Sequence, residues 1–177
     1  MTIQYHHDIE QGTEEWLTMR QGILTASTMN KILTPAKLEP SKGKTVTEFC
    51  DHLISEQITN EVEDHFQSYE MMRGSEQEVI FRDLYSEHYA PVTECGFITN
   101  DKLGFTIGYS PDGLVGDVGS IEGKSRNRKY AIGTVIDNVL PNDYRLQCQT
   151  GLWVSEREWM DFISYSNGMR MAVIEIE

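Results

Sequence analysis

The sequence predicts an α/β protein with a central mixed β-sheet flanked by helices, in a single domain over residues 1–177. The chain has 177 residues and 39% hydrophobic residues, which is enough for one core. Helical patterns come first, several short strand-like segments follow, and helices and strands close the chain, as in sheets covered by helices. No run of 18 apolar residues occurs, so we expect no membrane-spanning helix.

The first half of the chain predicts four helices and one long loop. Thr13 is a suitable N-cap for a short helix, and residues 25–33 favour a second helix that ends before Pro35. Prolines, a glycine and three lysines predict a loop over 35–45. A third helix is expected from Thr45 or Thr47 to about Val62, with an apolar stripe at Phe49, Leu53, Ile54 and Ile58. A fourth is expected over 69–88, with Val79, Ile80, Leu84 and Tyr85 pointing inward.

The second half predicts a series of strands followed by two more helices. We expect helices over 129–139 and 144–154. The expected strands lie near 92–99, 103–109, 113–116, 119–124, 159–165 and 171–176.

The three cysteines and the N-terminal residues indicate a cytoplasmic protein. Cys50, Cys95 and Cys148 are odd in number and far apart, as expected for free thiols in a reducing compartment. Residues 1–7 lack the basic and apolar regions of a secretory signal.

A net charge of −13 is unusual for a protein that binds nucleic acid. Exposed charges are screened beyond about 8–10 Å, so local patches matter more than the total. Acidic residues concentrate over 47–88, whereas basic residues cluster in two places. We expect DNA contacts from Arg126 and Arg128, beside Lys129, and from Lys37 and Lys42, beside Lys44; the alternative is that all are ordinary solvated side chains.

The most informative motif is Pro111-Asp112, followed ten positions later by Glu122-Gly123-Lys124. On a strand, Glu122 and Lys124 share one face, with Cα atoms roughly 6–7 Å apart. The turn residues 116–119 join the two parts into a hairpin. A symmetric four-residue loop would place Asp112 opposite Gly123, on the wrong face, so the motif predicts an odd loop or a bulge that brings Asp112 beside Glu122.

Two carboxylates gathered in this way predict a metal site. At about 4 Å they repel by roughly 1 kcal/mol in water, and by about 4 kcal/mol at an effective dielectric near 20. A hard divalent cation reverses that repulsion, and oxygen ligands favour Mg²⁺ or Mn²⁺ over Zn²⁺. The alternative is a surface hairpin with solvated charges, because short E-x-K strings are common.

Other residues suggest the same chemistry only in combination. Glu78 and Arg82 are four apart on one helix face, and alone they read as a surface ion pair. Arg20 together with Thr25 and Ser27 at a helix start could hold a phosphate, or could be a solvated arginine and an N-cap. Gln149, four residues before Trp153, is either a site residue or polar surface.

These motifs, in this order, resemble the lambda-exonuclease family of phage recombination nucleases, also called YqaJ-type viral recombinases. The residues that carry the resemblance are Gly12 to Trp16, Arg20, Gly22, Ile23, Thr25 to Ser27, Gly74, Glu78, Arg82, Ser110 to Leu114, Glu122 to Lys124, Gln147 to Gln149, Trp153 and Val154.

The resemblance implies a restriction-endonuclease-like fold of the PD-(D/E)XK superfamily and a Mg²⁺-dependent enzyme, with Mn²⁺ as a substitute. It implies degradation of one strand of linear duplex DNA from the 5′ end, which leaves 3′ single-stranded tails for phage-type recombination. It also implies a homotrimeric ring, a single-strand annealing protein as partner, and a phage or prophage protein in a bacterial cytoplasm.

The resemblance also implies roles for individual residues. Asp112, Glu122 and the Gly123 carbonyl would bind metal, with Glu78 supporting a second ion. Lys124 would position the attacking water with help from Gln149, and Arg20 and Ser27 would anchor the 5′-phosphate. Gly123 departs from the family, which usually has an apolar residue there. The alternatives are a related nuclease with endonuclease or single-strand activity, and an inactive DNA-end-binding protein.

Overall fold

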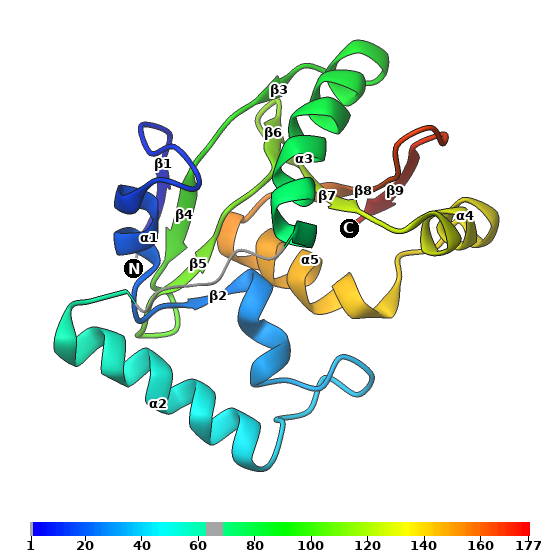
Figure 1. The fold of residues 1–177 in the computed structure, drawn as a ribbon. Coiled ribbons are helices and arrows are strands. Elements are labelled where there is room, and N and C mark those ends of the chain that lie inside the picture. Colours follow the sequence, from blue (N-terminus) through cyan, green and yellow to red (C-terminus); the bar gives the residue numbers. More distant parts are fainter. Residues whose placement is uncertain (1, 63–68) are drawn as a thin grey trace. The chain divides into compact units, whose positions relative to one another are not determined.

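The computed structural model describes residues 2–62 and 69–177, and the chain divides into two compact units that are each built from three segments. The first unit comprises Met1–Asp64, Cys95–Ser110 and Asn142–Ser155; the second comprises His65–Glu94, Pro111–Pro141 and Glu156–Glu177. The predicted α/β fold with mixed sheets and flanking helices is confirmed, and the strands are distributed over two sheets (Figure 1).

The first unit contains a four-stranded sheet in the order β1-β4-β5-β2. Strands β1 (Ile3–His6), β4 (Phe97–Asn100) and β5 (Ile107–Tyr109) are antiparallel neighbours, and β2 (Leu24–Thr25) runs parallel to β5. Strands β1 and β2, of four and two residues, are too short to be recognised from the sequence and were not expected. They pair with β4 and β5 and form the two edge strands of this sheet.

Helices complete the first unit. The short helix α1 (Glu14–Arg20) begins at Thr13, whose side chain accepts a hydrogen bond from Trp16 N, as the sequence predicts. The expected helix over 25–33 is the 3₁₀ helix η1 (Ala26–Lys31), and α2 (Lys44–Thr59) follows the loop. Helix α5 (Asn142–Ser155) packs against η1, β4 and β5, and its buried residues include Leu146, Cys148 and Leu152.

The second unit contains a five-stranded sheet in the order β3-β6-β7-β8-β9. Only β7 and β8 are parallel; the other neighbours are antiparallel. The strands are β3 (Val92–Thr93), β6 (Gly113–Val115), β7 (Gly119–Ser125), β8 (Trp159–Tyr165) and β9 (Ala172–Ile176).

Helix α3 (Tyr69–His88) packs against β7 and β8, and α4 (Arg128–Asp137) contacts β8 and β9. Phe81 and Tyr85, four residues apart on α3, join Ile121, Ile163 and Tyr165 in the core of this unit. Because the core face of α3 is set by these two large aromatic side chains, Val79 and Ile80 are exposed, and the prediction that they point inward is wrong. The predicted stripe on α2 is wrong in the same way, since Ile54 and Ile58 are exposed and Glu56 is buried.

None of the helices in the described ranges is long and apolar enough to cross a membrane. Cys50, Cys95 and Cys148 are free thiols, as expected.

Candidate active site

The hairpin of β6 and β7 has the register that the sequence motif requires. Gly113 lies opposite Ile121, and a three-residue loop over 116–118 joins the strands. Gly116 in that loop has φ +52°, in the left-handed region that glycine adopts readily. Continuing the register by one residue places Asp112 opposite Glu122, so the predicted offset is confirmed.

Hydrogen bonds fix both carboxylates of the hairpin. Asp112 Oδ2 accepts a hydrogen bond of 2.6 Å from the Gly123 backbone N–H. The Lys124 ammonium donates to Glu122 Oε1, also at 2.6 Å. Glu122 is only 1% exposed, whereas the Lys124 side chain is 27% exposed and reaches solvent. Two carboxylates and one ammonium group therefore meet where β6 begins.

The electrostatics of this site favour an additional cation. Burial raises the pKa of Asp112 well above its usual value, and the Glu122 carboxylate raises it further, despite Lys124 and the Gly123 N–H bond. Burial also raises the pKa of Glu78, where Glu122 adds to the effect and Arg82 and Lys124 oppose it. The single ammonium does not compensate the gathered negative charge.

Arg82 connects α3 to the bend at Asp112. Its Nη1 donates to the Asp112 carbonyl at 3.2 Å and lies 3.8 Å from Glu78 Oε1 and 3.6 Å from Glu94 Oε2. The Arg82 side chain is only 16% exposed. The pair of Glu78 and Arg82, which alone would be read as a surface ion pair, is therefore partly buried and links α3 to the bend. The sequence pairs Glu78 with Arg82 but gives no signal for the bond to Asp112.

The oxygen atoms of this site suit a hard divalent cation that keeps coordination positions open for water and substrate. Within the described residues, no group of three acidic, histidine or cysteine side chains could hold a metal by itself. Asp112 and Glu122 supply two carboxylates, and Mg²⁺ commonly binds one or two carboxylates while retaining water and substrate phosphate. Ser164, which pairs with Lys124 in the β7–β8 register, has a buried hydroxyl without a hydrogen-bond partner in the described chain. A buried hydroxyl without a hydrogen-bond partner suits a site that takes up water or an ion.

A second candidate group lies in the first unit around Arg20. Its guanidinium stacks 4.2 Å from the Trp16 ring centroid and 5.7 Å from that of Phe97. Arg20 Nη1 and Trp16 Nε1 both donate to Ser110 Oγ at 2.9 Å. None of the described carboxylates pairs with Arg20, and burial lowers its pKa to about 10. A partly buried guanidinium without a counter-ion is a site for an anion.

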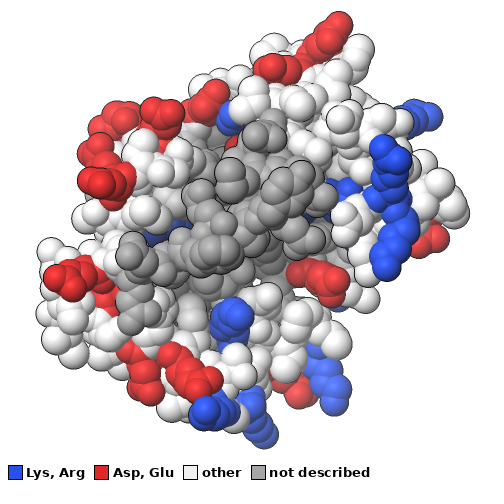
Figure 2. All heavy atoms as spheres, in the orientation of Figure 1, with Lys and Arg blue, Asp and Glu red and all other residues white. Residues whose placement is uncertain are grey.

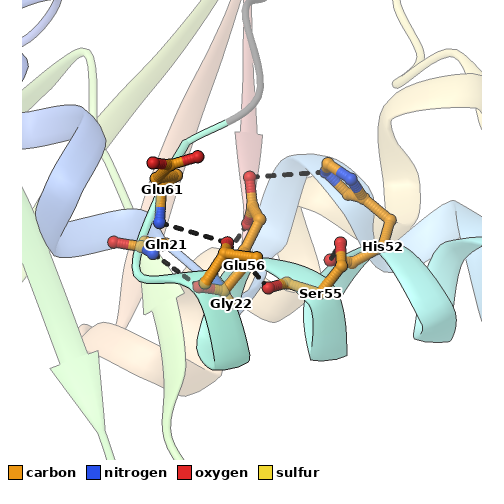
Figure 3. A network of polar contacts seen from close by, with 7 residues as sticks. Gln21, Gly22, His52, Ser55, Glu56 and Glu61 are labelled. Carbon is orange, nitrogen blue, oxygen red and sulfur yellow. Dashed lines mark hydrogen bonds and ion pairs between the residues drawn. The ribbon is translucent and has the colours of Figure 1, made fainter.

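The turn that follows Arg20 is held by a buried glutamate of α2 (Figure 3). Glu56 Oε2 accepts from Gly22 N at 2.8 Å, and Oε1 lies 3.5 Å from His52 Nε2. The Gln21 side-chain amide donates to the Glu56 carbonyl at 2.6 Å. Gly22 has φ +63°, and a Cβ there would lie 2.3 Å from Gln57 Cγ, so only glycine fits. Helix α2 therefore fixes the turn that follows Arg20, and the sequence gives no signal for this contact.

The sequence model of the YqaJ-like viral recombinase domain matches residues 15–158. The chain belongs to this family. No curated protein sequence matches it.

Solved structures give the same relationship. The alkaline exonuclease LHK-Exo from Laribacter hongkongensis is 30% identical, with a TM-score of 0.77 over 93% of this chain and 83% of LHK-Exo. LHK-Exo in complex with dAMP gives 32% identity and a TM-score of 0.80, over 93% and 82% of the two chains. SSO0001, at 15% identity and a TM-score of 0.53, covers 95% and 79% and shares the fold alone.

The remaining predicted site residues of this YqaJ-like chain are distributed over both units. The Thr25 side chain is engaged with Thr28 Oγ1 at 3.0 Å and with Ser27 Oγ at 3.2 Å. Ser27, Lys37 and Lys42 are exposed. Gln149 is exposed on α5 in the first unit, and Arg126 and Arg128 flank the start of α4 in the second; the roles of all these residues stay predictions.

Gly123, where the resemblance leads us to expect an apolar residue, lies against Phe81. A Cβ at Gly123 would lie 2.0 Å from Phe81 Cζ, so the ring occupies the space that a side chain would take. The strand is thereby packed against α3 one helical turn from Glu78 and next to Arg82. The packing that an apolar residue would provide comes here from the helix.

Gly123→Ala should therefore disturb both the fold and the site. Overpacking costs about 1–3 kcal/mol, and the displaced Gly123 N–H should loosen Asp112. Gly119→Ala is a matched control, because its Cβ would lie 2.1 Å from Trp159 Cζ2, away from the carboxylates. Thermal melting should show similar losses for both variants, whereas only Gly123→Ala should need more Mn²⁺ for stabilisation. An equal Mn²⁺ response in the two variants would contradict the coupling.

Proposed function

We propose that this protein is a Mg²⁺-dependent nuclease that degrades one strand of linear duplex DNA from its 5′ end and leaves 3′ single-stranded tails for recombination. The observation that carries the proposal is the placement of Asp112 opposite Glu122, with Lys124 two residues further on the same strand. This arrangement joins cation-binding oxygens to a group that can act on water. The family and the likeness to an alkaline exonuclease support it.

Each residue of the hairpin has a distinct role in this proposal. Asp112, Glu122 and the Gly123 carbonyl would hold Mg²⁺ or Mn²⁺, and Glu78 would support a second ion through water. The bound cations supply Lewis-acid stabilisation of the phosphate charge and lower the pKa of water. Lys124, held by its hydrogen bond to Glu122, would position the attacking water by donating a hydrogen bond to the water oxygen. Gln149 would orient Lys124 or the water.

The Arg20 group supplies a preference for one DNA end. A guanidinium held flat by Trp16 and Phe97 presents its N–H groups in a fixed plane, which suits a terminal phosphate with its extra negative charge. Ser27 and Thr25 would add hydroxyl contacts at the start of η1. The proposed substrate is therefore a 5′-phosphorylated end.

The deciding experiment compares DNA forms with and without Mg²⁺. Linear duplexes with a 5′-phosphate, linear duplexes with a 5′-hydroxyl, nicked circles and closed circles are incubated with the protein. Shortening from the phosphorylated 5′ end supports the proposal, and cutting of closed circles indicates an endonuclease. Binding without cutting would indicate an end-binding protein, which the complete set of Asp112, Glu122 and Lys124 disfavours.

Arg20→Ala should remove the preference for a 5′-phosphate. We expect the ratio of kcat/KM for phosphorylated over unphosphorylated ends to fall by about 10-fold or more, because a charge-assisted hydrogen bond contributes about 1.5–3 kcal/mol. Arg20→Lys is the matched variant, which keeps the charge but loses the planar stacking, and should give an intermediate ratio. An unchanged ratio in Arg20→Ala would place the phosphate site elsewhere.

The resemblance also suggests how the nuclease would be organised in the cell. We expect a homo-oligomer, in the form of a ring trimer, working with a single-strand annealing protein in the cytoplasm of a bacterial host that carries a phage or prophage. The mass of the full chain in solution, with and without DNA, tests the trimer directly.

A further inference from the structure

We propose that a hollow at the start of α4 is a second DNA-phosphate site, which holds a backbone phosphodiester next to the one that is cut. The proposal rests on the nuclease function above and assigns a separate contact with the substrate. The hollow has a volume of about 550 Å³ in the second unit. It is lined by Gln77, Arg126, Asn127, Arg128, Lys129, Ser166 and Asn167.

The charged residues around the hollow are basic, although the chain as a whole is acidic. The protein carries a net charge of −13, yet three cations and no described aspartate or glutamate line this space. In the space-filling view, Lys and Arg side chains gather where Figure 1 draws α4 (Figure 2). A concave lining whose charged residues are all basic attracts an anion even when the whole molecule is acidic, because screening limits the reach of distant charges.

The topology places the hollow where sheets bind ligands. Strands β7 and β8 are the one parallel pair among the described strands of this sheet, and they end at Ser125 and Tyr165. Arg126 and Ser166, which follow directly, both line the hollow. Ligands of α/β sheets bind beyond the carboxyl ends of parallel strands. Lys124 lies on β7 two residues before Arg126, so a phosphate in the hollow would be adjacent to the catalytic hairpin.

The start of α4 is arranged for an anion and not for helix stability. The helix has no acidic residue in its first turn and no side-chain cap from Asn127; instead, Arg128 and Lys129 stand there. Cations at the positive end of a helix dipole are unfavourable. The N–H groups of Tyr130 and Ala131 donate to the Asn127 carbonyl, and those of Arg128 and Lys129 have no hydrogen-bond partner among the described residues. A phosphate would satisfy the N–H groups and both side chains together.

A serine hydroxyl also belongs to the lining of the hollow. Ser166 follows β8 directly and lines the hollow, although the residue as a whole is only 6% exposed. A serine hydroxyl can donate a hydrogen bond to a phosphate oxygen.

Arg126 has a different task from its two neighbours. It donates to the Tyr130 carbonyl at 3.2 Å and to Thr134 Oγ1, so it holds α4 against the end of β7. Arg128 and Lys129 are exposed, with Lys129 over the Tyr130 ring at 4.6 Å. We assign the phosphate contact to Arg128, Lys129 and Ser166, and the support of the helix to Arg126.

The test is a charge reversal with a matched control in the same unit. Arg128→Glu and Arg170→Glu both change the charge by two, but Arg170 is exposed on the β8–β9 turn and does not line the hollow. The dissociation constant for a 5′-phosphorylated duplex is measured from 0.05 to 0.3 M salt in EDTA, so that no cleavage occurs. Loss of one phosphate contact reduces the salt slope by about 0.9, which weakens binding roughly eightfold at 0.1 M salt.

We expect that change for Arg128→Glu and little change in slope for Arg170→Glu. The melting temperature of Arg128→Ala should be unchanged or higher, since a cation leaves the positive end of the helix. Equal slopes for the two glutamate variants would overturn the proposal, as would loss of binding that follows a lower melting temperature in Arg128→Ala. If the unaltered protein neither binds nor cuts duplex DNA, the nuclease function itself fails, and this outcome is distinct from equal slopes.

Discussion

Lys124→Ala should lower kcat for duplex degradation by about 100- to 10,000-fold, the range for loss of a residue that assists proton transfer. Binding of DNA in EDTA should stay measurable, because Lys124 is one cation among several. The ammonium lies 2.6 Å from a Glu122 carboxylate that is almost fully buried. Among the described residues of β7, Lys124 alone carries an ammonium group.

The same substitution has a second, independent consequence. Without Lys124, Glu122 becomes a buried carboxylate that has lost its cation, and breaking such a pair costs about 3–5 kcal/mol when fully buried and less here, since Lys124 is partly exposed. Mg²⁺ should then raise the melting temperature of the variant more than that of the unaltered protein. Lys124→Met keeps the aliphatic packing and should behave alike. A near-normal rate in either variant would remove Lys124 from the mechanism.

The hairpin could be predicted from the sequence because its geometry is local. The spacing of Asp112, Glu122 and Lys124, together with strand alternation, leaves only one register that brings the three groups together, and the three-residue loop provides it. Helix α3 was placed correctly for the same reason. Its buried face was not, because that face depends on Phe81 fitting over Gly123, a contact between distant segments.

The contacts that sequence reasoning missed all join segments far apart in the chain. Arg82 bonds to the Asp112 carbonyl, Glu56 holds the Gly22 turn, and Ser166 lines the same hollow as the start of α4. None of these pairs has a characteristic spacing. A buried polar position such as Glu56, in a helix expected to bury isoleucine, is visible only once the partners are placed.

Asp112→Asn should make the metal-free protein more stable and the enzyme inactive. Asparagine keeps an oxygen that can accept the 2.6 Å hydrogen bond from Gly123 N, but it removes a buried charge beside Glu122. Each kcal/mol of relieved repulsion should raise the melting temperature by about 2–4 °C for a chain of this size. The loss of a direct ligand should lower activity by more than the roughly 10- to 100-fold that an outer-shell partner costs.

The pH dependence of this gain follows from the sign of the shift. Burial, and then Glu122, raise the pKa of Asp112 in the folded state above that in the unfolded state. The folded state is thus favoured when Asp112 is protonated, and the free energy of unfolding decreases as pH rises through the folded pKa. Asparagine does not titrate, so the two proteins should melt alike in acid and diverge as pH rises.

Thermal melting in EDTA across pH, repeated with saturating Mg²⁺, measures both effects. Asp117→Asn, which removes an exposed charge from the loop of the same hairpin, is the matched control and should show neither the gain in EDTA nor the loss of the Mg²⁺ response. If Asp112→Asn melted lower than the unaltered protein in EDTA at neutral pH, the carboxylate would be stabilising the fold, and its assignment as a cation ligand held against repulsion would be wrong. A cation site should show this combination of higher stability without metal and lost activity in Asp112→Asn. The negative charges that repel each other in the metal-free fold are the same charges that attract the ion.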